Sequence, residues 1–221
     1  MQLDAILFDF DGTLFDTIHL IVDSYQYMYR KHKKREYSVD EIKAGIGLPL
    51  EEVIIGEYPE DGPDMLETYL EYSNERTKYS YGIFLGIGPM LQELKKLGIP
   101  LGIVTAKRFK QAKASLETSG LEDYFDCLVT KFDTEIHKPD PAPLNFGMKK
   151  LGFEDPTKII YVGDAIFDVQ AAKNGNFISA AVAWTQIKPE VLKAENPDIW
   201  LEKPEDLVEI VKANYKKEMN G

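Results

Sequence analysis

Short apolar runs, each followed by polar or small residues, recur along this chain and restrict the folds open to it. The runs occupy residues 5–8, 100–104, 125–129, 159–162 and 178–182. Helical patterns separate the later runs, at residues 89–97, 109–119 and 141–151 and in a segment that stops near Gly175. Apolar strands that alternate with helices form a parallel sheet covered on both faces. The sequence therefore predicts an α/β fold with a doubly wound, Rossmann-like parallel sheet.

The segment from residue 16 to residue 81 interrupts this alternation. It carries helical patterns without a strand signal, at residues 19–33, 40–45 and 64–79. The segment leaves the carboxyl end of the first strand, which is the edge at which open α/β sheets bind ligands. We therefore predict a core of residues 1–15 and 82–221, with a small α-helical cap domain of residues 16–81 inserted above the ligand crevice.

The composition favours a small ligand over a large anionic partner. The 221 residues are 44% hydrophobic, which is enough for one full core and a smaller unit. The formal net charge is -11, whereas nucleic acids and anionic membranes are bound by clustered Lys and Arg. The basic run at residues 30–35 is interpreted as a solvated helix end. We expect no nucleic-acid partner and no membrane partner.

Cysteine usage predicts the compartment. Cys127 is the single cysteine, so no internal disulfide is possible, and its apolar surroundings suggest a buried hydrophobe. The N-terminus lacks a basic and then apolar leader. Both observations predict a cytoplasmic protein.

Asp9 and Asp11 follow the first apolar run, directly before Gly12. Residues two apart on a strand share a face, so both carboxylates are expected to lean toward the same space. Two negative charges at such a short distance repel each other unless a cation or a shared proton offsets them. A divalent metal ion is the simplest offset. The alternative is that both residues simply form a turn, where Asp and Gly are common.

Four more polar residues follow apolar runs or lie beside them: Thr105, Lys138, Asp164 and Asp168. Each has an ordinary structural interpretation, as a helix cap, a surface lysine or an acidic residue at a helix N-terminus. The carboxyl ends of parallel strands lie along one edge of a sheet, however, so these side chains can converge with the first Asp pair. The joint pattern favours an active site.

The order Asp-x-Asp-Gly-Thr, Thr, Lys and Gly-Asp-x-x-x-Asp resembles the four motifs of the haloacid dehalogenase superfamily of phosphohydrolases, over nearly the whole chain. The helical insertion resembles the cap of the branch that contains phosphoglycolate phosphatases, inorganic pyrophosphatases and β-phosphoglucomutases. The string Gly47-Leu48-Pro49 resembles the cap loop that faces the active site in that branch.

This resemblance implies a magnesium-dependent phosphatase that hydrolyses a small phosphorylated metabolite through an aspartyl phosphate. Asp9 would be the nucleophile and Asp11 the general acid and base. Thr105 and Lys138 would hold the transferring phosphoryl group.

The implied Mg²⁺ ligands are the Asp9 carboxylate, the Asp11 backbone carbonyl and the Asp164 carboxylate. Asp168 would be a further Mg²⁺ ligand, or it would hold one of the ligands in position without contacting the ion.

Substrate binding would involve the string Thr105-Ala106-Lys107, which resembles the Thr-Asn-Lys and Thr-Thr-Lys strings of phosphoglycolate phosphatases and pyrophosphatases. Ala106 departs from both forms, so the choice between these substrates stays open. Lys107 or Arg108 could meet a second anionic group of the substrate, or the two could form a solvated helix start. Three cap tyrosines are further candidates for shaping substrate choice: Tyr72, Tyr79 and Tyr81.

Two alternatives to a phosphatase remain at this stage. A phosphomutase of the β-phosphoglucomutase type would use the same aspartates. A non-catalytic phosphate-binding module would use the same fold, because fold alone does not determine function. The expected oligomeric state is a monomer or a homodimer.

Overall fold

A parallel sheet forms the centre of the computed structural model, which describes residues 3–80 and 82–219. Its strands are β1 (Ala5–Phe8), β2 (Leu101–Val104), β3 (Cys127–Val129), β4 (Ile159–Gly163), β5 (Ile178–Val182) and β6 (Ile199–Leu201). The spatial order is β3-β2-β1-β4-β5-β6, and all five strand pairs are parallel. The predicted doubly wound α/β fold is confirmed. The order reverses beside β1, which is where such sheets bind ligands.

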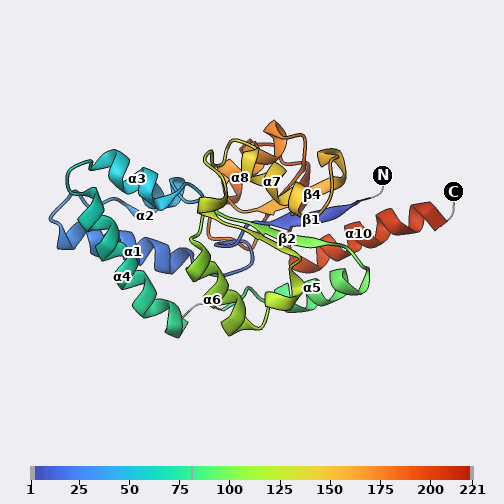
Figure 1. Ribbon diagram of the computed structural model, residues 1–221, viewed down its shortest axis with the longest axis horizontal. Coiled ribbons are helices and arrows are strands. Elements are labelled where there is room, and N and C mark those ends of the chain that lie inside the picture. The colour runs from blue at the N-terminus through green and yellow to red at the C-terminus, as the bar shows by residue number, and fades with distance from the viewer. Residues whose placement is uncertain (1–2, 81, 220–221) are drawn as a thin grey trace.

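Helices cover both faces of the sheet because side chains alternate along each strand. Ile6 and Phe8 of β1 point into one apolar layer and Leu7 points into the other. The first layer is covered by α5 (Ile87–Lys96), α6 (Phe109–Ser119) and α10 (Pro204–Met219). The second is covered by α7 (Ala142–Lys150), α8 (Ile166–Asn174) and α9 (Pro189–Ala194). Figure 1 shows the two layers on either side of β1 and β2.

The remaining helices gather beyond one end of the sheet (Figure 1). They are α1 (Ile18–Lys31), α2 (Val39–Ala44), α3 (Leu50–Glu57) and α4 (Gly62–Ser80). They bury an apolar cluster of their own around Met28, Ile54 and Met65. The sequence patterns predicted α1, α2 and α4 but not α3, which is short and carries Gly56 near its end. Residue 81, the predicted boundary, lies outside the described part of the chain.

Some local features agree with the sequence-based interpretation and others add to it. Three side chains of the basic run, Arg30, Lys34 and Arg35, form ion pairs with nearby acidic residues, as expected of a solvated helix end. Cys127 is buried in β3, and burial raises the pKa of its thiol to about 11. The strand β6 and the helices α9 and α10 had not been predicted. Short 3-10 helices span Glu122–Tyr124, Lys131–Asp133 and Pro156–Lys158. Within residues 3–80 and 82–219, no helix combines the length and apolar character needed to cross a membrane.

Candidate active site

The polar residues predicted to converge do meet at the carboxyl ends of the central strands. Asp9 follows β1, Thr105 follows β2 and Asp164 follows β4. The Asp9 backbone N–H donates to the Val162 carbonyl at 2.8 Å, so the sheet ladder extends to the first aspartate. Asp9, Thr105 and Asp164 are all buried. Their positions follow from the parallel sheet, because every strand ends at the same edge.

Lys138 joins two of the buried carboxylates. Its Nζ lies 3.0 Å from Asp9 Oδ1 and 2.6 Å from Asp168 Oδ1, and it donates to the Tyr161 hydroxyl at 3.0 Å. Asp168 Oδ2 also accepts the backbone N–H groups of Asp164 and Ala165, at 3.1 and 2.9 Å. Both oxygens of Asp168 are therefore engaged at the start of α8, and this side chain holds Lys138 in place.

Burial and mutual repulsion alter the charge of the carboxylates. Burial raises the pKa of Asp9 to about 7, although Lys138 partly opposes this effect. Burial also raises the pKa of Asp164 well above its usual value, and the nearby Asp168 and Asp9 carboxylates add to this. Burial lowers the pKa of Lys138, but the Asp168 and Asp9 carboxylates outweigh it and hold that pKa above the usual range. The site therefore has more negative charge than one lysine can balance.

These carboxylates fit a divalent metal ion. Asp9, Asp164 and Asp168 each offer a carboxylate oxygen, and the three atoms lie within 4.8 Å of one another. Carboxylate oxygens are ligands that hard cations such as Mg²⁺ and Ca²⁺ prefer. A bound cation would offset both the burial and the mutual repulsion that raise the pKa values of Asp9 and Asp164.

Gly12 lets the loop after β1 pass close to Asp164. Its φ is +79°, and a Cβ atom added there would lie 2.0 Å from Asp164 Oδ2. The Asp164 carboxylate also accepts hydrogen bonds from the hydroxyls of Thr13, at 3.0 Å, and Thr185, at 2.7 Å. Only glycine meets both the backbone and the space requirement at position 12.

The Asp11 carboxylate is not part of the cluster formed by Asp9, Asp164 and Asp168, and it contacts a different set of residues. Lys107 Nζ lies 2.7 Å from Asp11 Oδ1 and 2.9 Å from Oδ2, and the Thr17 hydroxyl donates to Asp11 Oδ1 at 2.7 Å. Asp11 and Lys107 side chains are 16% and 17% exposed, so the pair faces the cavity rather than open solvent. Asp11 is therefore a carboxylate held in position beside Asp9.

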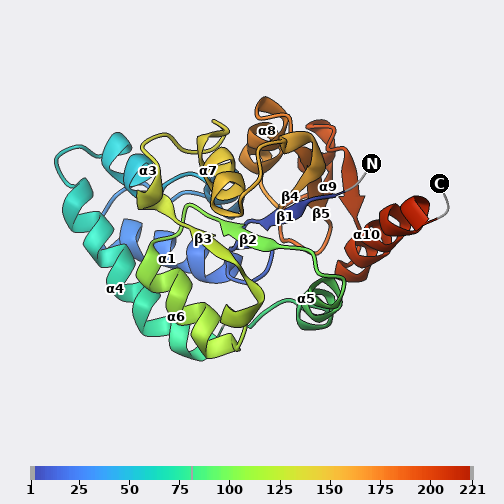
Figure 2. The same cartoon turned by 45° about the vertical axis from the view of Figure 1, so that its right-hand side comes forward.

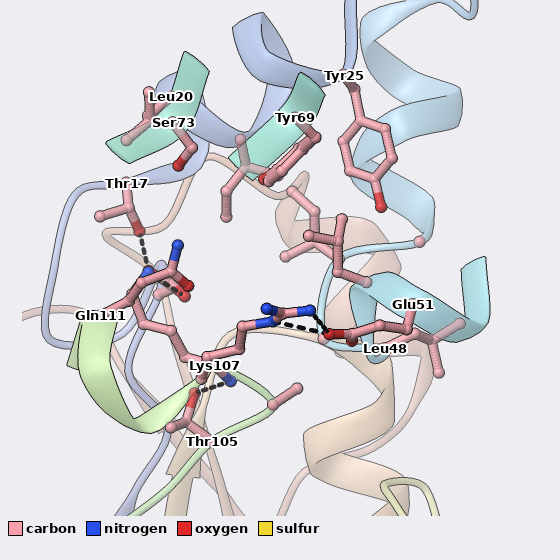
Figure 3. Close-up of a pocket in the computed structure, with 18 of the residues that line it drawn as sticks. Thr17, Leu20, Tyr25, Leu48, Glu51, Tyr69, Ser73, Thr105, Lys107 and Gln111 are labelled. Carbon is pink, nitrogen blue, oxygen red and sulfur yellow. Dashed lines mark hydrogen bonds and ion pairs between the residues drawn. The ribbon is translucent and has the colours of Figure 1, made fainter. Parts of the chain in front are cut away.

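A cavity of about 100 Å³ connects these groups to the helices at the end of the sheet. The core contributes Asp9, Asp11 and the stretch from Thr105 to Arg108, which contains the predicted Ala106 and Lys107. The helical unit, formed by α1 to α4 and the loops between them, contributes Glu51 and mainly apolar residues, among them Leu20, Ile21, Tyr25, Ile46, Leu48 and Tyr69. Figure 3 shows Thr105 and Lys107 facing Tyr69 and Leu48 across this space.

The cap candidates from the sequence have different places. Gly47 and Leu48 line the cavity. Tyr72 instead stacks on Tyr27, with ring centroids 4.3 Å apart, and is not among the residues that line the cavity. The Tyr79 side chain and Tyr81 lie outside the described residues.

Several residues in contact with the site residues were not predicted from the sequence, among them Thr17, Tyr161, Lys131, Thr185 and Glu51. Lys131 and Thr185 lie in the loops that follow β3 and β5, so a search of the whole loop after every strand would have included both. Glu51, in the first turn of α3, contacts Arg108 and Lys131 across the cavity. The sequence alone gives no signal for Glu51, because α3 itself was not predicted.

Comparisons with known proteins agree with this geometry. The family model of haloacid dehalogenase-like hydrolases matches residues 6–182. The chain is 37% identical over 209 residues to a protein named pyrophosphatase PpaX from Bacillus velezensis, covering 95% of this chain and 96% of that one. It is 32% identical to pyrophosphatase PpaX from Anoxybacillus flavithermus, covering 96% and 98%.

Solved structures share the fold. A predicted phosphoglycolate phosphatase from Haemophilus somnus superposes with a TM-score of 0.83 at 21% identity, covering 95% of this chain and 98% of that one. A predicted phosphatase from Clostridium acetobutylicum gives a TM-score of 0.80 at 24% identity, covering 96% and 100%. With a family model that matches most of its length and relatives that span it almost completely, this chain belongs to the haloacid dehalogenase-like hydrolases.

Proposed function

We propose that this phosphate hydrolase cleaves a small phosphorylated metabolite, with inorganic pyrophosphate as the favoured substrate, by forming an aspartyl phosphate on Asp9. The observation that carries the proposal is the buried Asp9 carboxylate, which lines a small cavity and lies 3.0 Å from Lys138 Nζ. Full-length relatives named pyrophosphatase PpaX support the choice of pyrophosphate over phosphoglycolate.

The reaction would proceed in two steps. An oxygen of Asp9 attacks phosphorus, the bond to the leaving oxygen breaks, and the Asp11 carboxyl group donates a proton to that oxygen. Asp11 then takes a proton from a water molecule that attacks phosphorus, which releases phosphate and restores the Asp9 carboxylate. The hydrogen bond from Thr17 and the ion pair with Lys107 support this role, because they hold Asp11 in one orientation.

Two further core residues would bind the phosphoryl group. Lys138 lies between Asp9 and Asp168 and would neutralise charge on the phosphoryl oxygens. The buried Thr105 would donate its hydroxyl to another phosphoryl oxygen.

The Asp9 and Asp164 carboxylates and the Asp11 backbone carbonyl are the ligands we assign to Mg²⁺. When bound, this ion would supply positive charge that offsets the carboxylates and the phosphoryl group. Asp168 already accepts hydrogen bonds on both oxygens, which supports a role in orienting Lys138 and the start of α8.

We also propose that residues 16–81 act as a cap domain that excludes water from the site. Their helices carry an apolar cluster separate from the sheet, and they supply one wall of the cavity. Figure 2 shows α4 beside α6 of the core, where Gln111 Nε2 donates to Asn74 Oδ1 at 2.9 Å. This exposed hydrogen bond joins the helical segment to the core beside Gln111, which lines the cavity.

The test is release of inorganic phosphate from pyrophosphate, phosphoglycolate, sugar phosphates and nucleotides, with and without Mg²⁺. We expect metal-dependent release that is fastest with pyrophosphate and is abolished by Asp9→Asn. Transfer of phosphate between positions of a sugar, without release, would instead identify a mutase. Absence of release from every substrate would indicate a binding module.

A further inference from the structure

Cations and carboxylates are unevenly distributed around the cavity. Lys138 contacts two carboxylates, those of Asp9 and Asp168. Lys107 contacts one, that of Asp11. The positive charge of each lysine is therefore already balanced by the carboxylates it contacts, so neither lysine is suited to bind an additional anionic group of a substrate.

A third group has the opposite balance. Arg108 Nε donates to Glu51 Oε1 at 2.8 Å, Arg108 Nη2 donates to the same oxygen, and Lys131 Nζ donates to Glu51 Oε2. Two cations from the core thus hold one carboxylate from α3. Lys131 is buried, and the Glu51 side chain is 18% exposed. Burial raises the pKa of Glu51, but Lys131 and Arg108 outweigh burial and keep that pKa below its usual value.

This group adjoins the reacting residues. Arg108 comes three residues after Thr105, so their Cα atoms are at most about 11 Å apart. Arg108, Thr105, Asp9 and Glu51 all line the same cavity, and Lys131 lies behind Glu51, whose Oε2 accepts from its Nζ. Arg108 Nε reaches Glu51 Oε1 at 2.8 Å, and Figure 3 shows Glu51 on the cap side of the cavity that Thr105 and Lys107 line from the core. An anion bound at Asp9 and Thr105 could therefore extend a second charged group toward Arg108.

We propose that Arg108 and Lys131 form a binding site for the second anionic group of the substrate, the distal phosphoryl group of a diphosphate, and that Glu51 occupies this site until substrate enters. The inference rests on the proposed function and identifies how that function selects its substrate. One carboxylate between two cations leaves net positive charge, which a distal phosphoryl group would neutralise more completely.

The size of the cavity agrees with a small substrate. A buried water molecule needs about 10–15 Å³ of such space, so about 100 Å³ holds roughly seven to ten waters. That number is close to the number of heavy atoms in a diphosphate.

The experiment compares KM for pyrophosphate with KM for phenyl phosphate, at saturating Mg²⁺. The leaving group of phenyl phosphate carries no second anionic group, so it cannot use the site. We expect Arg108→Gln to raise KM for pyrophosphate by about tenfold or more, since a charged hydrogen bond is lost, and KM for phenyl phosphate by less than about threefold. Glu51→Gln should lower KM for pyrophosphate alone, because the competing carboxylate is gone.

Asp40→Asn is the matched control. Asp40 of α2 also pairs with a core cation, Lys188, at 2.7 Å, but this pair is exposed and outside the cavity. Loss of a carboxylate that bridges the helical unit and the core should therefore leave both KM values unchanged. Melting temperatures of all variants would check that each one is folded.

The proposal would be overturned if Arg108→Gln raised both KM values equally, or if Glu51→Gln weakened pyrophosphate binding. Either result would mean that the Glu51 group only attaches α3 to the core, and the proposed hydrolase function would stand. Absence of phosphate release from both substrates with the wild-type protein would instead reject the proposed function, and the binding site with it.

Discussion

Lys138 connects the proposed nucleophile to the start of α8, so its removal affects both binding and charge balance. We expect Lys138→Ala to retain the fold and to lower turnover by about a hundredfold or more. The phosphoryl group would lose the cation that neutralises it, and Asp9 would lose the side chain that holds it in place. Phosphate release at saturating Mg²⁺ measures the loss, and circular dichroism checks the fold. Lys150→Ala, at an exposed lysine of α7, is the control. Near-normal turnover of Lys138→Ala would contradict the role assigned to this lysine.

Substitution of Gly12 tests whether its close approach to Asp164 matters for the site. An alanine at position 12 would meet Asp164 Oδ2 at 2.0 Å, in addition to its strained φ of +79°. Gly98 has a similar φ of +74° but no atom within 4 Å of an added Cβ. Gly98→Ala should cost about 1–2 kcal/mol of stability through the backbone alone and leave activity unchanged.

We expect Gly12→Ala to destabilise more than Gly98→Ala and to weaken Mg²⁺ activation, because Asp164 must move. Chemical denaturation and the Mg²⁺ concentration at half-maximal activity are the measurements. Equal effects of the two substitutions would show that the close approach to Asp164 has no functional consequence.

Among the helices, alanine substitutions at two glycines should change the stability of the protein in opposite directions. Gly147 of α7 is buried, and an added Cβ would lie 2.8 Å from Val104 Cγ2 of β2. Gly147→Ala should therefore destabilise the protein by about 1–2 kcal/mol, since overpacking outweighs the gain in helix propensity. A Cβ added to Gly56 of α3 would have no atom within 4 Å, so Gly56→Ala should stabilise the protein by about 0.5 kcal/mol.

Urea unfolding curves of the two variants measure both signs. A destabilising Gly56→Ala would mean that α3 depends on a flexible residue. A neutral Gly147→Ala would mean that α7 can move away from the sheet without cost, and that its close contact with β2 does not help to position the loop containing Lys138.

For the whole molecule, metal binding should couple to folding. The carboxylates of Asp9 and Asp164 come from different strands, so they are close together only in the folded chain. At a free Mg²⁺ concentration one hundred times Kd, binding would add about 2.7 kcal/mol to stability. For a domain of this size, that corresponds to a rise of about 5–10 °C in Tm.

Thermal melts with and without Mg²⁺ test this coupling. We expect the rise in Tm to disappear in Asp164→Asn and to persist in Asp123→Asn, where the aspartate is exposed. An equal rise in both variants would mean that the ion binds elsewhere. EDTA should reverse the stabilisation of the wild-type protein.

Most of the parallel sheet could be predicted from the sequence alone, because apolar runs and helical patterns depend only on residues that are near one another in the chain. It predicted β5 and α6 with their observed ends, Ile178–Val182 and Phe109–Ser119. It also indicated which residues would converge, since the carboxyl ends of parallel strands share one edge. Asp9, Thr105 and Asp164 were found in this way.

The remaining contacts become visible only in the folded chain, because they join residues far apart in the sequence through side chains with no local pattern. Lys107 meets Asp11 across 96 positions, and Lys131 meets Glu51 across 80. The sequence analysis left open whether Lys107 or Arg108 would serve a second anionic group. In the fold Lys107 pairs with Asp11 and Arg108 pairs with Glu51, because a partly buried charge is costly unless an opposite charge lies beside it.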